Sequence, residues 1–322
     1  MDGSVYPSFL MKGDTMNYTK LSVEAFRTSM MCAVRVFLPD NGRGLQIQSH
    51  DISKGNDVHL HGISFRAEES NKAPIVYIDR YYEQYLDGSS ISDLARQLAD
   101  EFEQTPKIEN PPDIDMSWDS VKDRLGLRLY ETKRNSGYLK DKVTFDAGCG
   151  LSLVPVVVIN DDNRRFECTV TTEIAEAFGL NDDDLMEYAF ISAPLIDEPV
   201  LEDLEETLTS FLAIPENYLL RTEPIDEPVP IYLLTNKSGL NGAAAFFYPG
   251  IRQKIGHLLG KDYYVLPSSL QELIIVPERD GISAPDLKAM VTTANRSVVM
   301  PEDILSDNVF KYDRDTGIMR IV

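Results

Sequence analysis

The pattern of hydrophobic and polar positions is clearest between residues 230 and 277. Two apolar runs of strand length, 231–234 and 242–248, flank a turn rich in Asn, Ser and Gly, which predicts a β-hairpin. Apolar residues then recur at helical spacing over 251–259, and Gly260 follows where a helix would end. We therefore expect a hairpin and then a helix whose apolar stripe packs on a sheet.

The chain after this helix predicts further strands. Residues 263–266 and 273–276 are apolar runs separated by a Pro-Ser-Ser turn. Ser283 precedes an amphipathic stretch as an N-cap would, which predicts another helix, and two short runs around a turn close the chain. The C-terminal part is therefore expected to be a β-β-α-β-β-α-hairpin unit.

The N-terminal part predicts an α-β-β-β-α unit. Apolar residues recur at helical spacing from Val23 and again after Ser90, which has the position of an N-cap. Three strand-like segments lie between these two helices, at 45–49, 58–65 and 75–78.

The middle of the chain is less regular. Residues 151–159 have the composition of a buried strand, although Pro155 would then need an edge position or a bulge. Helices are expected at 172–178, 182–191 and 201–212.

Together these elements predict an α+β protein with several small mixed or antiparallel sheets and packed helices. The expected divisions are a disordered lead-in 1–15, an N-terminal unit 16–104, a linker 105–116, a middle α/β unit with acidic helices 117–220, a linker 221–229 and a C-terminal α+β unit 230–322. Both linkers are rich in proline. Met1 and Met16 are both possible start sites, and the three units are either separate domains or parts of one body.

The charge of the chain narrows the function classes. There are 31 basic and 52 acidic residues, a net charge of −21, so phosphates and anionic membrane surfaces are repelled. Residues 181–228 hold fourteen acidic side chains against Arg221 alone. Such a run is usually a solvated face. The alternatives are a docking surface for a basic protein partner and a mimic of nucleic-acid charge.

One acidic segment also has the Ala and Gly spacing of a helix-turn-helix. Asp182, Asp183 and Asp184 stand where a recognition helix needs basic or amide side chains, so an acidic helical hairpin is the better interpretation. Direct binding of nucleic acid is therefore not expected.

The cysteines and the apolar runs bear on the compartment. Cys32, Cys149 and Cys168 are odd in number and far apart, which argues against a disulfide framework and for a reducing environment. The N-terminus lacks the pattern of a secretory signal, and the run 151–159 is too short to span a bilayer. We expect a cytoplasmic protein that does not bind membranes.

Candidate binding residues lie in two turns of the C-terminal unit, at Asn236 and at Ser268, Ser269 and Glu272. A nucleophilic serine requires a base, and His257 is the only histidine in this unit. No G-x-S-x-G turn exposes a serine, so a structural turn is favoured over a catalytic one.

Neither a metal site nor a cofactor site is predicted. His59 and His61 would share one face of a strand, but no third ligand accompanies them. The turn after Asn236 lacks the G-x-x-x-x-G-K-[ST] pattern of a phosphate-binding loop. No residue is assigned a catalytic role.

The segments YLLTN, GAAAFFYPG, YYVLPSSLQELIIVP and NRSVVMPEDILSDNVFKY resemble a family of unknown function that is common in anaerobic Gram-positive bacteria. HLHGISF and IVYIDRYYEQYLDG resemble the N-terminal signature of the same family. The resemblance implies no activity. A His-Glu pair often follows the two serines in that family, whereas Gln271 stands before Glu272 here.

These observations favour a non-enzymatic accessory or interaction protein with an acidic surface. The first alternative is a hydrolase-like enzyme with its site around the Pro267-Ser268-Ser269 turn. The second is a nucleic-acid mimic that inhibits a DNA-binding protein.

Overall fold

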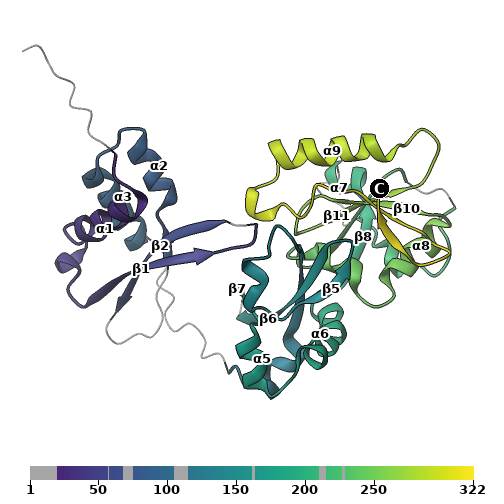
Figure 1. Ribbon diagram of the computed structural model, residues 1–322, viewed down its shortest axis with the longest axis horizontal. Helices are drawn as coiled ribbons and strands as arrows, with labels where there is room; N and C mark the ends of the chain where they lie inside the picture. Colours follow the sequence, from purple (N-terminus) through teal and green to yellow (C-terminus); the bar gives the residue numbers. More distant parts are fainter. Residues whose placement is uncertain are drawn as a thin grey trace, which may run out of the picture. The chain divides into compact units, whose positions relative to one another are not determined.

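The structure is a computed structural model that describes residues 20–56, 58–67, 75–104, 115–161, 164–209, 215–226 and 229–322. The chain divides into two compact units (Figure 1). The first unit comprises residues up to 52 together with 60–109, and the second comprises 53–59 together with residues from 110 onward. The predicted lead-in 1–15 and residues 105–114 of the predicted linker lie outside the described residues.

The first unit is a three-stranded sheet with three helices. Its elements are α1 (Val23–Val34), β1 (Leu45–Ser53), β2 (His59–Ala67), β3 (Ile75–Tyr77), α2 (Asp79–Leu86) and α3 (Ile91–Gln104), with a short 3-10 turn at Pro39–Gly42. Phe26 and Met30 of α1 meet Leu98 of α3 in its core. The Ser22 hydroxyl accepts the amide of Ala25 and so caps α1. The predicted helices and strands of this region are all present, and the segment RYYEQYLDG, expected to be a helical turn that ends near Gly88, lies in α2 and the turn after it.

The second unit contains two sheets. Its elements up to residue 196 are α4 (Trp118–Val121), β4 (Leu125–Glu131), β5 (Phe145–Gly148), β6 (Leu151–Asp161), β7 (Arg164–Thr169), α5 (Thr172–Phe178) and α6 (Asp182–Ile196), with 3-10 turns at Lys122–Arg124 and Tyr138–Asp141. The remainder are β8 (Pro199–Asp203), α7 (Leu204–Thr209), β9 (Tyr232–Asn236), the 3-10 helix η5 (Gly242–Phe247), α8 (Ile251–Leu259), β10 (Tyr263–Pro267), β11 (Leu273–Pro277), α9 (Ala284–Ser297), β12 (Phe310–Tyr312) and β13 (Met319–Ile321), with 3-10 turns at Tyr218–Leu220 and Pro301–Asp303. These two units bear out the α+β prediction.

Strand β6 is the centre of the four-stranded sheet, and Pro155 lies within it. One side of β6 pairs with β4 from Leu151 to Val157, where Pro155 faces Leu127. The other side pairs with β5 up to Leu153 and with β7 from Val156. The Pro155 carbonyl accepts the amide of Val170, so its nitrogen also points to this second side, into the gap between β5 and β7. The predicted edge position is thus met locally, because no neighbouring strand requires the missing N–H.

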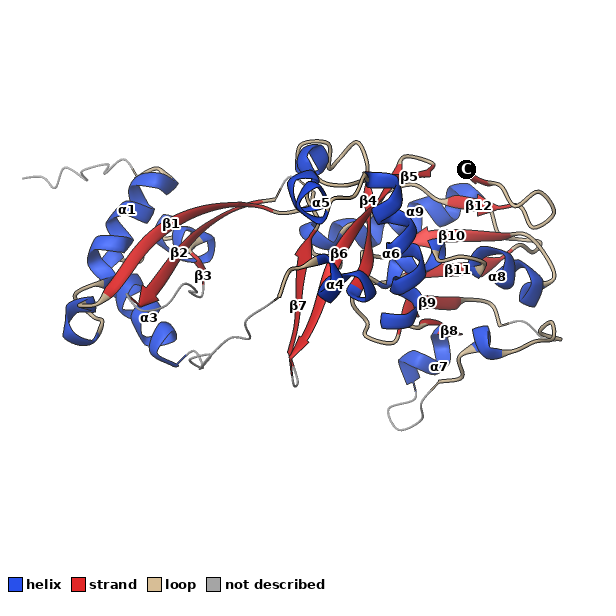
Figure 2. Ribbon diagram, turned by 90° about the horizontal axis from the view of Figure 1, so that it is seen from below, coloured by secondary structure: helices blue, strands red, loops and turns tan. Residues whose placement is uncertain are grey.

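The six-stranded sheet has the order β13-β12-β10-β11-β9-β8, and Figure 2 shows β12 to β8 of it side by side. Its two faces belong to different cores. Tyr264, Leu266 and Val276 point toward Leu287 and Val291 of α9. The alternate residues join a larger core that also contains buried side chains of β4, β6, α6, η5 and α8. The predicted middle and C-terminal units therefore share one hydrophobic core.

Two predicted elements were wrong. Residues 242–248 were expected to form a strand, but η5 covers most of them, and Gly242 to Phe247 are all buried. A short, fully buried apolar run carries no periodicity that separates a strand from a helical turn. Residues 201–212 were expected to form one helix, but Leu201 lies in β8 and α7 covers Leu204–Thr209, while residues 210–212 lie outside the described residues. No side chain of α7 is buried, so the apolar spacing does not mark a packed helix face.

The shared core predicts that both parts of the second unit unfold together. Phe246 is fully buried and lines a seam with Leu129 and Leu151 of the other sheet. The Phe246→Ala variant should lower the free energy of unfolding by about 3–5 kcal/mol. The single tryptophan, Trp118, lies in the other part of the unit, so its fluorescence should report this shift in a urea titration.

Leu208→Ala, at a side chain that is 68% exposed, is the control and should change the free energy of unfolding by less than about 0.5 kcal/mol. An unchanged Trp118 transition beside a shifted circular-dichroism transition would contradict the shared core.

Candidate functional site

The predicted binding residues lie at one end of the six-stranded sheet. The turn of residues 267–272, here the serine turn, joins β10 to β11, and Asn236 ends the neighbouring strand β9. The hydroxyl of Thr235 donates to the carbonyl oxygen of Gln271 at 2.9 Å, which ties the two turns together. The structure therefore brings these residues near one another, as parts of two adjacent turns.

Their polar atoms are used within the turns. Ser268 Oγ donates to Glu272 Oε1 at 3.1 Å, and Ser269 Oγ accepts the amide of Gln271 at 3.0 Å. The side-chain amide of Asn236 donates to the carbonyl of Leu240 at 2.8 Å and its oxygen accepts the hydroxyl of Ser238. These contacts are those of turns that are stabilised by their own side chains.

Acidic side chains lie next to the serine turn, whereas the histidine of this part of the chain does not. His257 lies on α8, and its Nε2 is 3.3 Å from the carbonyl oxygen of Thr222, so it does not face Ser268. Burial raises the pKa of Glu202 on β8, and the charges of Glu206 and Glu272 add to the effect. An activated serine needs a base that a third group orients. The described residues at this turn supply a serine and acids without that arrangement.

The two strand histidines have separate partners. His59 Nδ1 lies 3.2 Å from the hydroxyl of Ser53, and His61 Nδ1 donates to Asp79 Oδ1 at 2.8 Å. Within the described ranges, no three His, Cys, Asp or Glu side chains are grouped so that they could hold a metal ion.

A charged cluster inside the second unit was not predicted from the sequence. We call it the Asn241 network. It consists of Arg128, Arg165, Glu167, Asp197 and Asn241. Arg128 pairs with Glu167 at 2.5 Å and donates to Asn241 Oδ1 at 2.8 Å. Arg165 donates to Glu167 at 2.9 Å and to both oxygens of Asp197 at 2.7 and 2.8 Å. The five residues come from segments that are far apart in the sequence, so no local motif marks them.

Glu167 stands at the centre of this network. Its side chain is only 12% exposed, and burial alone would favour the neutral carboxyl. The charge of Arg128, two hydrogen bonds from the Asn241 amide and the charge of Arg165 outweigh the burial and lower the pKa of Glu167. The carboxylate is thus ionised and fully partnered, which is the arrangement of a structural ion cluster.

The turn at Asn241 and Gly242 fits tightly between the network and the serine turn. Asn241 is buried and adopts a left-handed backbone with φ of 55°, which asparagine tolerates better than most residues. The backbone N–H of Asn241 donates to Gln271 Oε1 at 2.7 Å. A Cβ at Gly242 would lie 2.3 Å from both the Gln271 carbonyl oxygen and Thr235 Oγ1. This position therefore requires glycine because the backbones approach so closely.

The network also fixes helix α6. Asp197, which Arg165 binds with two hydrogen bonds, directly follows the helix, and Ser192 Oγ donates to the carbonyl of Leu125 at 2.5 Å. The side chains of Leu185, Met186 and Ala189 are buried against the core. The opposite side of α6 is consequently held outward.

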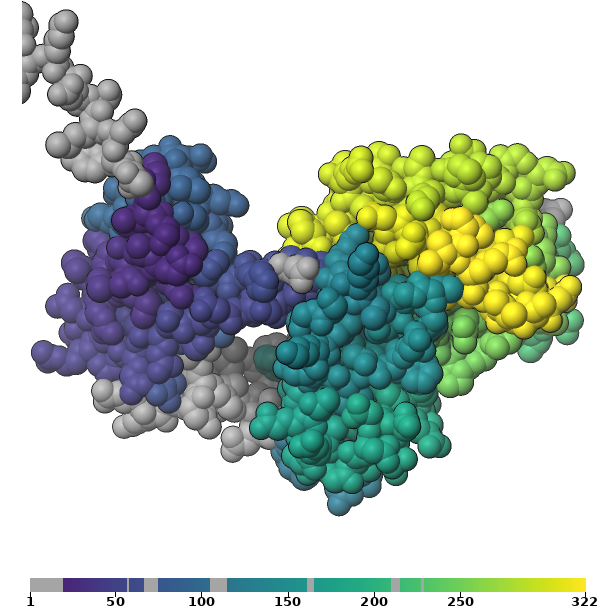
Figure 3. Space-filling view, viewed as in Figure 1, coloured from purple at the N-terminus to yellow at the C-terminus, as the bar shows by residue number. Residues whose placement is uncertain are grey.

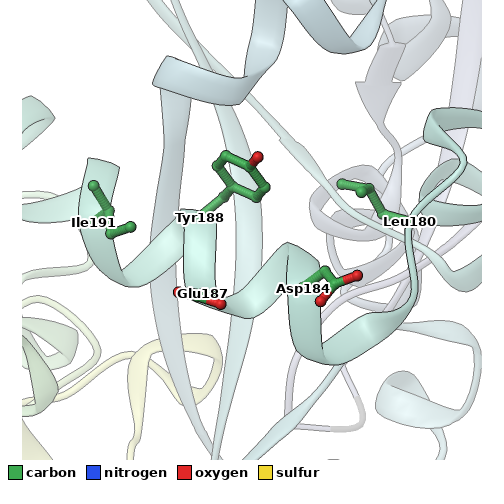
Figure 4. A pocket seen from close by; sticks show the side chains of 5 residues that line it. All are labelled: Leu180, Asp184, Glu187, Tyr188 and Ile191. Atoms are coloured by element: carbon green, nitrogen blue, oxygen red, sulfur yellow. The ribbon is translucent and has the colours of Figure 1, made fainter.

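That outward side, the α6 face, consists of Asp184, Glu187, Tyr188, Ile191 and Leu195. A hollow of about 340 Å³ opens over it, and Leu180 and the first four of these residues line it (Figure 4). The α5–α6 segment, teal to green in Figure 3, lies at the surface of the second unit. The ring of Trp118 packs edge-on against Tyr188, with centroids 4.8 Å apart. This face combines exposed acids with exposed apolar side chains.

Comparison with known families identifies the chain only at the level of sequence family. The model of one family matches residues 23–314, which is most of the chain. The chain belongs to the family of unknown function DUF5688. The predicted resemblance to a family of unknown function is confirmed. No curated protein and no solved structure matches the chain. Among the described residues, no helix has the length and apolar character needed to cross a membrane.

Glu167 should make the second unit sensitive to acid. Its folded pKa is lowered, so its contribution to stability is complete above the ordinary value of 4.5 and is lost as the pH falls through the folded value. Glu167→Gln should lower the free energy of unfolding at neutral pH by about 3 kcal/mol, because Arg128 loses its carboxylate partner and Arg165 keeps only Asp197. The variant should also show a shallower loss of stability below pH 4.5 in urea titrations.

Glu216→Gln is the matched control, because Glu216 also pairs with an arginine, Arg221, but at the surface. Its free energy of unfolding should equal that of the natural sequence within error. An equal loss in both variants would show that the Asn241 network has no special role.

The close approach at Gly242 gives a second test. Gly242→Ala should lower the free energy of unfolding by about 3 kcal/mol, because the added Cβ has to displace backbone. Gly137→Ala is the control, since its Cβ would meet no atom within 4 Å and its φ is −70°. It should change the value by less than about 0.5 kcal/mol. Equal stability of the two variants would refute the tight fit.

Proposed function

We propose that this protein is a non-enzymatic cytoplasmic accessory protein that binds a basic segment of another protein through the acidic part of its second unit. Residues 181–228 carry most of the excess negative charge of the chain. Among the described residues of that range, eight acidic side chains are exposed: Asp182, Asp183, Asp184, Glu187, Glu205, Glu216, Glu223 and Asp226. Opposite charges attract over about 8–10 Å at physiological salt, so this surface favours a basic partner.

The neighbourhood of these acids favours a protein partner over a mimic of nucleic acid. Ile191 is 59% exposed and Leu195 is 81% exposed, and both follow the acids on α6. A mimic needs a surface of charge, to which exposed leucine and isoleucine side chains contribute nothing. Protein interfaces, in contrast, combine an apolar centre with a charged rim.

Other features are consistent with this proposal. The buried titratable groups of the Asn241 network are mutually paired, as in a structural cluster, and the serine turn lacks an oriented base. All three cysteines are free, which suits a reducing compartment. We therefore prefer the interaction function to the hydrolase-like alternative.

The proposal predicts a partner whose capture depends on salt. The immobilised full chain should retain a basic protein from a lysate at about 50 mM salt and release it at about 0.5 M, because surface charges are screened. A variant with Glu205→Gln, Glu223→Gln and Asp226→Asn should retain less of it. The control variant, with Glu83→Gln, Asp87→Asn and Asp280→Asn at exposed positions elsewhere, should retain as much as the natural chain. If no basic protein is retained in a salt-dependent way, the proposed function is wrong.

A further inference from the structure

The α6 face is a row of side chains along which a second helix could pack. Its members stand at positions i, i+3, i+4, i+7 and i+11, which places them in one row along α6. From Asp184 to Leu195 the row spans about 16 Å, or roughly three helical turns. Tyr188 is 42% exposed, Ile191 59% and Leu195 81%. A row of this kind would normally be packed against another element.

The negative charge of the α6 face is concentrated at the end where the helix begins. Asp184 and Glu187 are exposed at the end where α6 begins, and Asp182 and Asp183 precede them in the same first turn. Lys122 is close enough to Tyr188 that the tyrosine adds to the rise in the lysine's pKa, which comes mainly from Asp119, and its ammonium already pairs with Asp119 at 2.9 Å. The apolar half and the acidic half therefore follow one another along the row.

We propose that the α6 face docks an amphipathic basic helix of the partner protein. This inference rests on the proposed function and assigns it a site. Apolar side chains of the partner, spaced at i, i+3 or i+4, and i+7, would cover Tyr188, Ile191 and Leu195, as in other helix-in-groove complexes. Lysine or arginine at its other end would meet Asp184 and Glu187. The hollow over the face supplies room for such side chains.

The acidic side chains of the α6 face favour a basic helix over other occupants. A second copy of the chain would bring the same acids together on molecules that each carry a net charge of −21, and such repulsion opposes self-association. Phosphates of nucleic acid and anionic headgroups of a membrane would be repelled by the same side chains. A basic helix gains from both halves of the row.

The position of Trp118 makes the site directly measurable. It is the only tryptophan of the chain, and its ring contacts Tyr188. The probe is a fluorescein-labelled peptide of about 18 residues, made of leucine and lysine with leucine on one helical face and with no tyrosine or tryptophan. We expect saturable binding to the full chain by fluorescence anisotropy, and a change in Trp118 emission with unlabelled peptide. A peptide of the same composition in scrambled order should bind at least about tenfold more weakly.

Variants separate the two halves of the face. Ile191→Ser with Leu195→Ser should raise the dissociation constant about tenfold or more, because two apolar contacts are lost. Asp184→Asn with Glu187→Gln should raise it about fivefold at low salt and flatten its salt dependence. The control pair is Met290→Ser, at a side chain 58% exposed on α9, with Asp280→Asn, and it should bind as the natural chain does. Circular dichroism should show all variants folded.

Three results would overturn this inference: no binding of the probe by the natural chain at low salt, equal binding of the scrambled peptide, or equal binding by the α6 variants. The lysate capture distinguishes this failure from failure of the proposed function. If the natural chain and the Ile191→Ser, Leu195→Ser variant retain the same basic partner equally, the function stands and the site is wrong. A partner lost only from the α6 variants supports both.

Discussion

The second unit depends on the carboxylate of Glu167, whose side chain is only 12% exposed. Glu167 lies between two arginines, and each arginine brings another part of the chain with it: Arg128 is on β4, and Arg165 also binds Asp197 at the end of α6. Asn241 adds the turn that leads into η5. A buried ion is tolerated only when its partners hold it in good geometry, so all these segments have to assemble together. The network thus acts as a junction that joins β4, β7, the end of α6 and the turn that leads into η5.

This junction determines which surface of α6 remains outside. The inner side chains of the helix are buried, and its end is fixed by Asp197 and by the hydrogen bond of Ser192 to β4. Acidic residues at its beginning interact favourably with the positive end of the helix dipole, so they stabilise α6 while they are exposed. The α6 face is therefore presented by a rigid support, which reduces the entropy that a partner would lose on binding.

Local signals predicted much of the fold. The N-cap serines Ser90 and Ser283 and the C-terminal Gly260 mark helix ends with side chains or backbone that act within one turn. What depends on distant contacts was missed. The run at 242–247 forms η5 because Gly242 lies against Gln271 and Thr235, and neither contact is visible in the spacing of apolar residues.

The candidate sites show the same difference between features with local signals and features that depend on distant contacts. Ser268, Ser269, Glu272 and Asn236 were recognisable as turn residues, and the structure shows their side chains serving those turns. The Asn241 network could not be found from sequence, because its contacts between segments join residues that are 32 to 113 positions apart and leave no spacing pattern. The acidic run was evident, but which of its members lie on an apolar face depended on how α6 packs.

Hydrogen exchange of the full chain tests the central claim most directly. Amides of α6 and the neighbouring Trp118 segment should gain protection when the leucine and lysine helix is added, and those of α9 should not change. Protection at another acidic surface, or none anywhere under conditions where the peptide is bound, would contradict the assignment of the α6 face.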